Sequence, residues 1–130
     1  MSDISSNSLT PTEKMCRIDA HLSHVWMVRT FLKHSDEAIE EDELRSIQRT
    51  LYDVMLAMGP TWKAQDPEAY LRQIRKKLSK LRAASEQFIQ LQPEISTHTN
   101  FQMAAQSLRQ AILEIETTIQ TVTDQGLAHE

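Results

Sequence analysis

Apolar residues recur at alternating three- and four-residue steps in four stretches of this chain. Because such a step averages about 3.5 residues, it keeps one apolar seam on one side of a helix, and that seam has to be buried against other helices. Short polar breaks separate the stretches, which predicts an all-α, antiparallel up-down-up-down four-helix bundle. The seams are Met15, Ile18, Leu22, Val25 and Leu32; Leu44, Ile47, Leu51, Val54 and Met58; Leu71, Ile74, Leu78, Leu81 and Phe88; and Phe101, Ala105, Leu108, Ile112, Ile115, Ile119 and Val122.

Capping residues predict the ends of the first two helices. Residues 10–13 (TPTE) form a capping box with proline at the first helical position, so the first helix should begin there and run to about residues 31–34. Ser35 and Asp36 offer a break and a new cap. Six of the eight residues in 36–43 are acidic, which suits the first turn of the second helix. Gly59 and Pro60 should end that helix, which would leave Trp62 in a loop covering the end of the bundle.

The last two helices carry similar signals. Asp66 followed by Pro67 should start the third helix, and Pro93 should lie just beyond its end. A second capping box at residues 99–102 (TNFQ) should start the fourth helix, which is expected to run to about residues 123–124.

The organisation that follows is a disordered N-terminal tail, residues 1–9, and a single bundle domain, residues 10–126. Two glycines and four prolines in 130 residues agree with helices rather than with an all-β fold. The first ten residues are polar and carry no apolar signal segment, and no run approaches the length of a membrane span. These features predict a cytoplasmic protein with no membrane partner.

Polar residues inside the seams are candidates for function. Arg29 interrupts the first seam and should point inward, where a guanidinium needs a carboxylate or carbonyl partner. The first turns of the second helix lie at the same level, so Glu40 or Glu43 is the expected partner. Ser85 is the corresponding break in the third helix, and its small side chain would leave room for the arginine.

The first helix also carries apolar residues on the side opposite its seam. A helix that is apolar nearly all round is buried nearly all round. This second stripe therefore predicts a partner, most simply a second copy of the chain in a two-fold homodimer. The expected interface residues are Cys16, Ala20, His24, Met27 and Phe31.

The histidines raise a metal or ligand site as an alternative. His21 and His24 share a helix face, and Glu94 and His98 are four residues apart in an expected loop. Di-iron bundles use Glu-x-x-His motifs with further inward glutamates, and this chain has no Glu-x-x-His. We therefore expect neither a metal site nor a cofactor.

The connections between helices one and two and between helices three and four should meet at one end of the bundle. That end gathers the most varied chemistry in the chain: Arg29, His34, Glu40, His98 and Asn100.

Arg29 and His34 have an Arg-x-x-x-x-His spacing that resembles the ribonuclease motif of the HEPN family of helical domains. The resemblance implies that His34 would assist attack by an RNA 2′-hydroxyl and that Arg29 would support the phosphate charge. Thr30 stands where that family usually has Asn, Asp or His, and the motif lies in the first helix rather than late in the chain.

Basic residues recur through the third helix, between the positions of its apolar seam. They should form an outer face that is solvated, meets an anion or RNA, or pairs with the acidic start of the second helix. A formal net charge of −4 and the lack of interleaved aromatic residues argue against nucleic-acid binding by the whole domain. The residues are Arg72, Arg75, Lys76, Lys77, Lys80 and Arg82.

The leading hypothesis is a small non-catalytic interaction or scaffold module, acting as a homodimer that also binds an unidentified protein. An RNA-binding or HEPN-like ribonuclease domain that uses Arg29 and His34 is the first alternative. A ligand- or metal-binding bundle is the second.

Overall fold

A computed structural model describes residues 8–121, and these residues form helices without strands. Four long helices and one short helix follow one another along the chain, so the predicted all-α bundle is confirmed. Their bounds are α2 Pro11–Lys33, α3 Asp36–Glu40, α4 Asp42–Lys63, α5 Pro67–Ile95 and α6 Thr99–Gln120.

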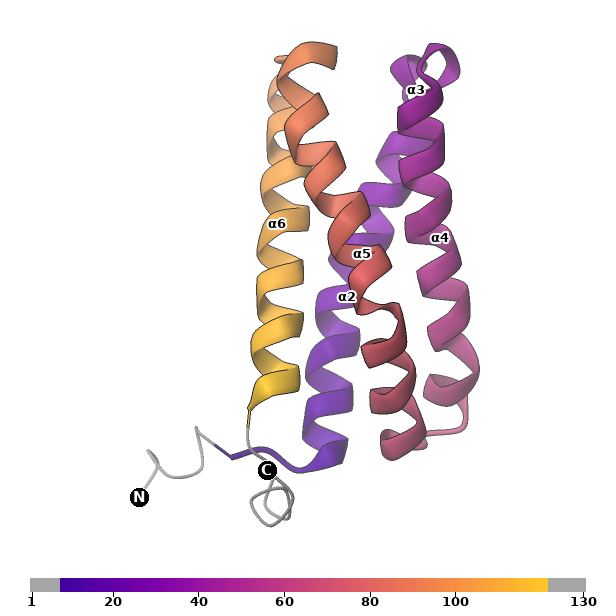
Figure 1. Ribbon diagram of the computed structural model, residues 1–130, viewed down its shortest axis with the longest axis vertical. Helices are drawn as coiled ribbons and strands as arrows, with labels where there is room; N and C mark the ends of the chain where they lie inside the picture. The colour runs from indigo at the N-terminus through magenta and orange to yellow at the C-terminus, as the bar shows by residue number, and fades with distance from the viewer. Residues whose placement is uncertain (1–7, 122–130) are drawn as a thin grey trace.

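The four long helices run alternately up and down, and the short α3 lies at the end of the bundle where α2 meets α4 (Figure 1). Around the bundle the order of neighbours is α2, α4, α5 and α6, with α6 packed back against α2. Helices α2 and α5 also touch across the diagonal. Within residues 8–121, no helix is both long and apolar enough to cross a membrane.

The core consists of the four apolar seams. Nearly every seam residue is buried; only Leu78 and Ile119 are half-buried, and Val122 lies outside the described residues. Burying one such side chain stabilises the fold by about 1.5–3 kcal/mol relative to leaving it exposed. The periodicity alone therefore located most of the interior.

Three of the predicted helix starts are confirmed by their hydrogen bonds. The Thr10 hydroxyl accepts from the Glu13 backbone N–H at 3.1 Å, and the Glu13 carboxylate accepts from the Thr10 N–H at 2.9 Å. Ser35 caps α3, and Asp66 caps α5. Leu9, expected in the tail, is buried, so ordered packing begins before the first cap.

The second predicted helix is broken in two at Glu41, whose backbone is extended. On one continuous helix Ala38 and Leu44 would point about 120° apart, whereas the break lets both side chains reach the core. Arg45 donates to the backbone carbonyls of Ala38 and Ile39, which lie at the end of α3, and pairs with Asp42. Arg45 thus connects the end of α3 to the start of α4.

The prediction that Gly59 and Pro60 end this helix was wrong, since α4 continues to Lys63. The Thr61 hydroxyl donates to the Met58 carbonyl in this last turn. Trp62 is therefore helical rather than in a loop, and its ring meets Tyr70 edge-on with 6.1 Å between centroids. Gln65, just beyond the end of α4, has a left-handed backbone, at φ 52°.

Two expectations for the other helix ends were also wrong. Helix α5 runs through Pro93 to Ile95, which makes Glu94 helical. Gln92 stabilises this last turn, because its side-chain amide donates to the Ser96 carbonyl at 2.8 Å. Helix α6 begins at Thr99, but its N-cap residue, His98, makes no side-chain capping bond.

A buried polar contact joins α2 to α5, and no feature of the seams predicted it. The fully buried Tyr70 donates its hydroxyl hydrogen to the half-buried Asp19 carboxylate at 3.0 Å. Burial raises the pKa of Asp19 above 3.8, and the hydrogen bond from Tyr70 offsets only part of that rise. Burial also raises the pKa of the Tyr70 hydroxyl.

We expect Gly59→Ala to stabilise the protein by about 0.5–1 kcal/mol, because Gly59 lies inside α4 and alanine is the better helix former. Its φ is not positive, and a Cβ placed there meets no atom within 4 Å. Urea denaturation measures the change in the free energy of unfolding. Ala83→Gly, at an exposed position inside α5, should lower stability by a similar amount. Destabilisation by Gly59→Ala would show that the helix ends at the glycine.

We expect Asp19→Asn to make the protein more stable near neutral pH, because the amide keeps an acceptor for Tyr70 and carries no charge to bury. The raised pKa means that the folded state binds the Asp19 proton more tightly than the unfolded state. The wild-type protein should therefore recover stability as the pH falls through that pKa towards 3.8. Thermal unfolding of both proteins across this range measures the difference, and a gap that widens on acidification would contradict the account.

Candidate functional site

Arg29 of α2 is enclosed by aromatic side chains rather than by carboxylates. Its guanidinium carbon lies 4.4 Å from the ring centroid of Tyr52 and 4.9 Å from that of Trp26. Its Nε donates to the side-chain oxygen of Gln48 at 3.3 Å. The prediction that Arg29 is buried is confirmed, since the residue is only 8% exposed. Its partners are Trp26 of α2 and Gln48 and Tyr52 of α4, so the expected pairing with Glu40 or Glu43 was wrong.

Arg29 lines a groove of about 310 Å³ between α2 and α4. The ion pairs found within residues 8–121 join other residues, so no carboxylate of that part lies within 4.0 Å of its guanidinium. Burying a charge is costly unless the charge is paired, and two ring faces with one amide oxygen offset only part of that cost. The groove is lined by Arg29, Lys33, Gln48, Arg49, Tyr52 and Asp53.

Ser85 is buried as expected, but it lines a different groove, between α5 and α6. This groove of about 490 Å³ also contains Arg82, which pairs with Glu116 across the two helices. The idea that Ser85 makes room for Arg29 is therefore not supported, because the room for Arg29 lies on the α4 side of α2.

The residues that were expected to meet at the end of the bundle with the α2–α3 and α5–α6 connections do not form one site. His34, Glu40, Glu43, His98 and Asn100 are all exposed. The α2–α3 connection and the α5–α6 connection occupy separate corners of that end (Figure 1). Within the described part of the chain, no hydrogen bond or ion pair joins the two corners.

Arg29 and His34 do not converge in the way the HEPN resemblance implies. Arg29 is fixed against α4, whereas His34 is exposed at the end of α2, with its Nδ1 2.9 Å from the Thr30 carbonyl oxygen. The hydroxyl of Thr30 is buried without a hydrogen-bond partner in the structure. The motif spacing thus places its two members in different environments.

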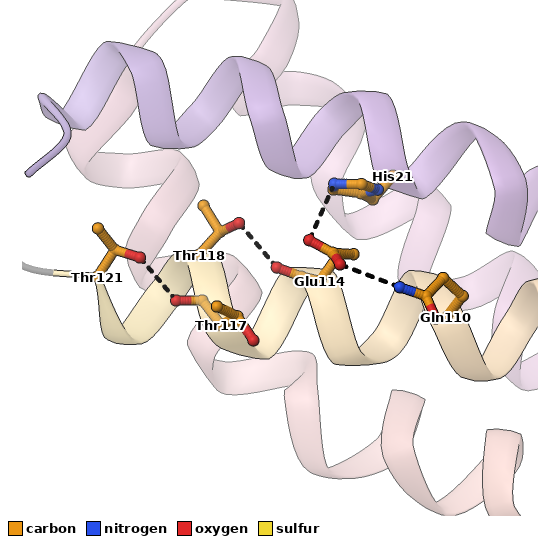
Figure 2. Close-up of polar contacts among 6 residues, drawn as sticks. All are labelled: His21, Gln110, Glu114, Thr117, Thr118 and Thr121. Atoms are coloured by element: carbon orange, nitrogen blue, oxygen red, sulfur yellow. Dashed lines mark hydrogen bonds and ion pairs between the residues drawn. The ribbon is translucent and has the colours of Figure 1, made fainter. Parts of the chain in front are cut away.

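His21 points towards α6, where an ion pair with Glu114 links the two helices (Figure 2). His21 Nε2 is 4.0 Å from one carboxylate oxygen of Glu114, and the Gln110 amide donates to the other at 3.0 Å. His24 lines the same groove of about 290 Å³. Among residues 8–121, no three His, Cys, Asp or Glu side chains are placed to hold a metal ion.

The basic residues of α5 do not share one partner or one face. Lys77 and Lys80 line a groove with Asp53 of α4, and Arg82 pairs with Glu116 of α6. The other three, Arg72, Arg75 and Lys76, are exposed. The start of α5 lies at the opposite end of the bundle from α3 (Figure 1), so the acidic segment does not cover this basic run within one chain.

The second apolar stripe of α2 is exposed over most of its length, at Cys16, Ala20, His24 and Met27. Phe31 departs from this stripe, because it is half-buried and its ring meets Phe101 of α6 edge-on at 4.9 Å. One expected interface residue is therefore covered within the chain itself.

The sequence reasoning missed the partners of Arg29. Trp26 and Arg29 are three residues apart on α2, and Gln48 and Tyr52 are four apart on α4, which are spacings that place side chains on one helix face. That signal was present for each helix separately. The level at which α2 packs against α4, which brings the two pairs together, is a tertiary feature.

Neither family models nor curated proteins nor solved structures gave a match to this chain.

Proposed function

We propose that this protein is a non-catalytic interaction module whose bundle self-associates into a homodimer through the outer face of α2. The observation that carries the proposal is the exposure of Met27, which is 63% exposed on this face.

The composition of the outer face of α2 supports this choice. Cys16, Ala20, Ser23, His24 and Met27 follow one another along it, and none carries a Lys, Arg, Asp or Glu charge. Depletion of charge at the centre, with aromatic residues and methionine enriched, is the composition that distinguishes the core of a protein interface. A two-fold contact uses the same patch on both copies, so one uncharged stripe is sufficient.

The ribonuclease alternative has no comparable support, because Arg29 and His34 lie in different environments. The metal alternative rests on two histidines whose acidic neighbour, Glu114, is already bonded by Gln110. For the compartment we keep the cytoplasm, since an exposed free thiol at Cys16 suits a reducing environment.

We expect Met27→Asp to convert the dimer to a folded monomer, because it places a charge at the centre of the uncharged stripe, where desolvation opposes association. Sedimentation velocity at micromolar concentrations measures the mass, and circular dichroism checks the fold. Leu113→Asp is the matched control: Leu113 is 51% exposed but lies in the α5–α6 groove, and its variant should remain dimeric.

A wild-type protein that is monomeric at these concentrations would refute self-association. Equal dissociation by Met27→Asp and Leu113→Asp would place the interface elsewhere.

A further inference from the structure

Beyond self-association, we propose that the groove between α2 and α4 is a binding site for the dianionic phosphate group of a small phosphomonoester, with Arg29 as its principal ligand. The geometry that carries the proposal is a cation more than nine-tenths buried, held in one orientation and left without an anionic partner.

Arg29 keeps most of its hydrogen-bonding capacity. A guanidinium has five N–H donors, and Gln48 takes the one on Nε. No other hydrogen bond from Arg29 is found within residues 8–121. The rings of Trp26 and Tyr52 hold the guanidinium, so its remaining donors are oriented before a ligand arrives. Preorganised donors cost little ordering on binding.

The charge of the groove matches a dianion better than a single carboxylate. Lys33 on α2 and Arg49 on α4 line it beside Arg29, and Asp53 is the acidic residue in the same lining. Three positive groups and one negative group leave a net charge of +2. A phosphomonoester carries a charge of about −1.5 to −2 at neutral pH and three strong acceptor oxygens, so it can engage the arginine and both flanking cations together.

The volume of the α2–α4 groove limits its ligand to a small molecule. At about 310 Å³ it lies at the lower end of the volumes of small-molecule sites. The groove between α4 and α5 provides a comparison, since cations, here Lys77 and Lys80, line it together with Asp53. Lys77 is only half-buried and Lys80 is exposed, so neither is an already desolvated and oriented charge.

The test uses Trp26 as the reporter. The chain has two tryptophans, so Trp62→Phe leaves Trp26 as the sole indole next to Arg29. Inorganic phosphate, O-phosphoserine and acetate are titrated at constant ionic strength while its fluorescence is followed. We expect saturable binding of both phosphate compounds in the millimolar range or tighter, and at least about tenfold weaker binding of acetate.

The two phosphate probes separate the sources of the ligand. Tighter binding of O-phosphoserine assigns the site to an organic phosphomonoester and supports the proposal. Binding of inorganic phosphate alone would overturn the assignment to a phosphomonoester. Binding of acetate as tight as that of phosphate would overturn the assignment to a dianion.

Matched variants locate the site. Arg29→Gln should weaken phosphoserine binding by at least about tenfold, the loss expected for a charge-assisted hydrogen-bonding group. Arg49→Gln changes an exposed residue and leaves Arg29 against Trp26 and Tyr52. It should weaken binding severalfold. This variant tests the site even if Arg29→Gln does not fold. Lys80→Gln, with the same loss of charge in the neighbouring groove, should leave binding nearly unchanged.

No saturable binding by the folded protein, or equal weakening by Arg49→Gln and Lys80→Gln, would overturn the proposal. Met27→Asp should bind phosphoserine as the wild type does, because Met27 is not part of the groove lining. The proposed phosphate site and the proposed dimer can therefore be refuted independently of each other.

Discussion

Burial of the four apolar seams is the interaction on which the rest of this molecule depends. The seams fill the interior, so a polar side chain that contacts another helix does so at the edge of the core, where two helices meet. Ile18, Leu51, Ile74 and Leu108, one from each long helix, are all fully buried. Polar side chains then collect where two helices meet: Asp19 with Tyr70, His21 with Glu114, and Arg29 with Gln48. The chemistry of the protein is therefore to be found in its grooves.

Arg29 shows what this arrangement costs a charged side chain. A buried ion loses several kcal/mol of hydration even after relaxation, while a desolvated cation–π contact returns about 2 kcal/mol or more. The faces of Trp26 and Tyr52 and one hydrogen bond from Gln48 thus stabilise the guanidinium without supplying a negative charge. An oxyanion in the groove would supply that charge, which links the packing of α2 against α4 to ligand binding.

Much of the fold could be predicted from the sequence, and the misses have local physical causes. The seams and the caps at Thr10, Ser35 and Asp66 act over a few residues, so they can be identified without the tertiary structure. The helix ends at Pro60 and Pro93 were misjudged because side chains of Thr61 and Gln92 stabilise the following turn. The burial of Arg29 was foreseen, but its partners depend on how two helices are aligned. The exposure of Met27 likewise followed from periodicity, whereas the coverage of Phe31 by α6 did not.

The most direct test of the central claim is a pair of crystal structures, one grown without phosphate or sulfate and one grown with O-phosphoserine. The account predicts that Arg29 lies between Trp26 and Tyr52 in both, bonded to Gln48 through Nε, with the phosphate oxygens on its other nitrogens in the second crystal. An Arg29 that pairs with Asp53 or another carboxylate in the anion-free crystal, or that turns out to solvent, would contradict it, because the cation would then already be satisfied.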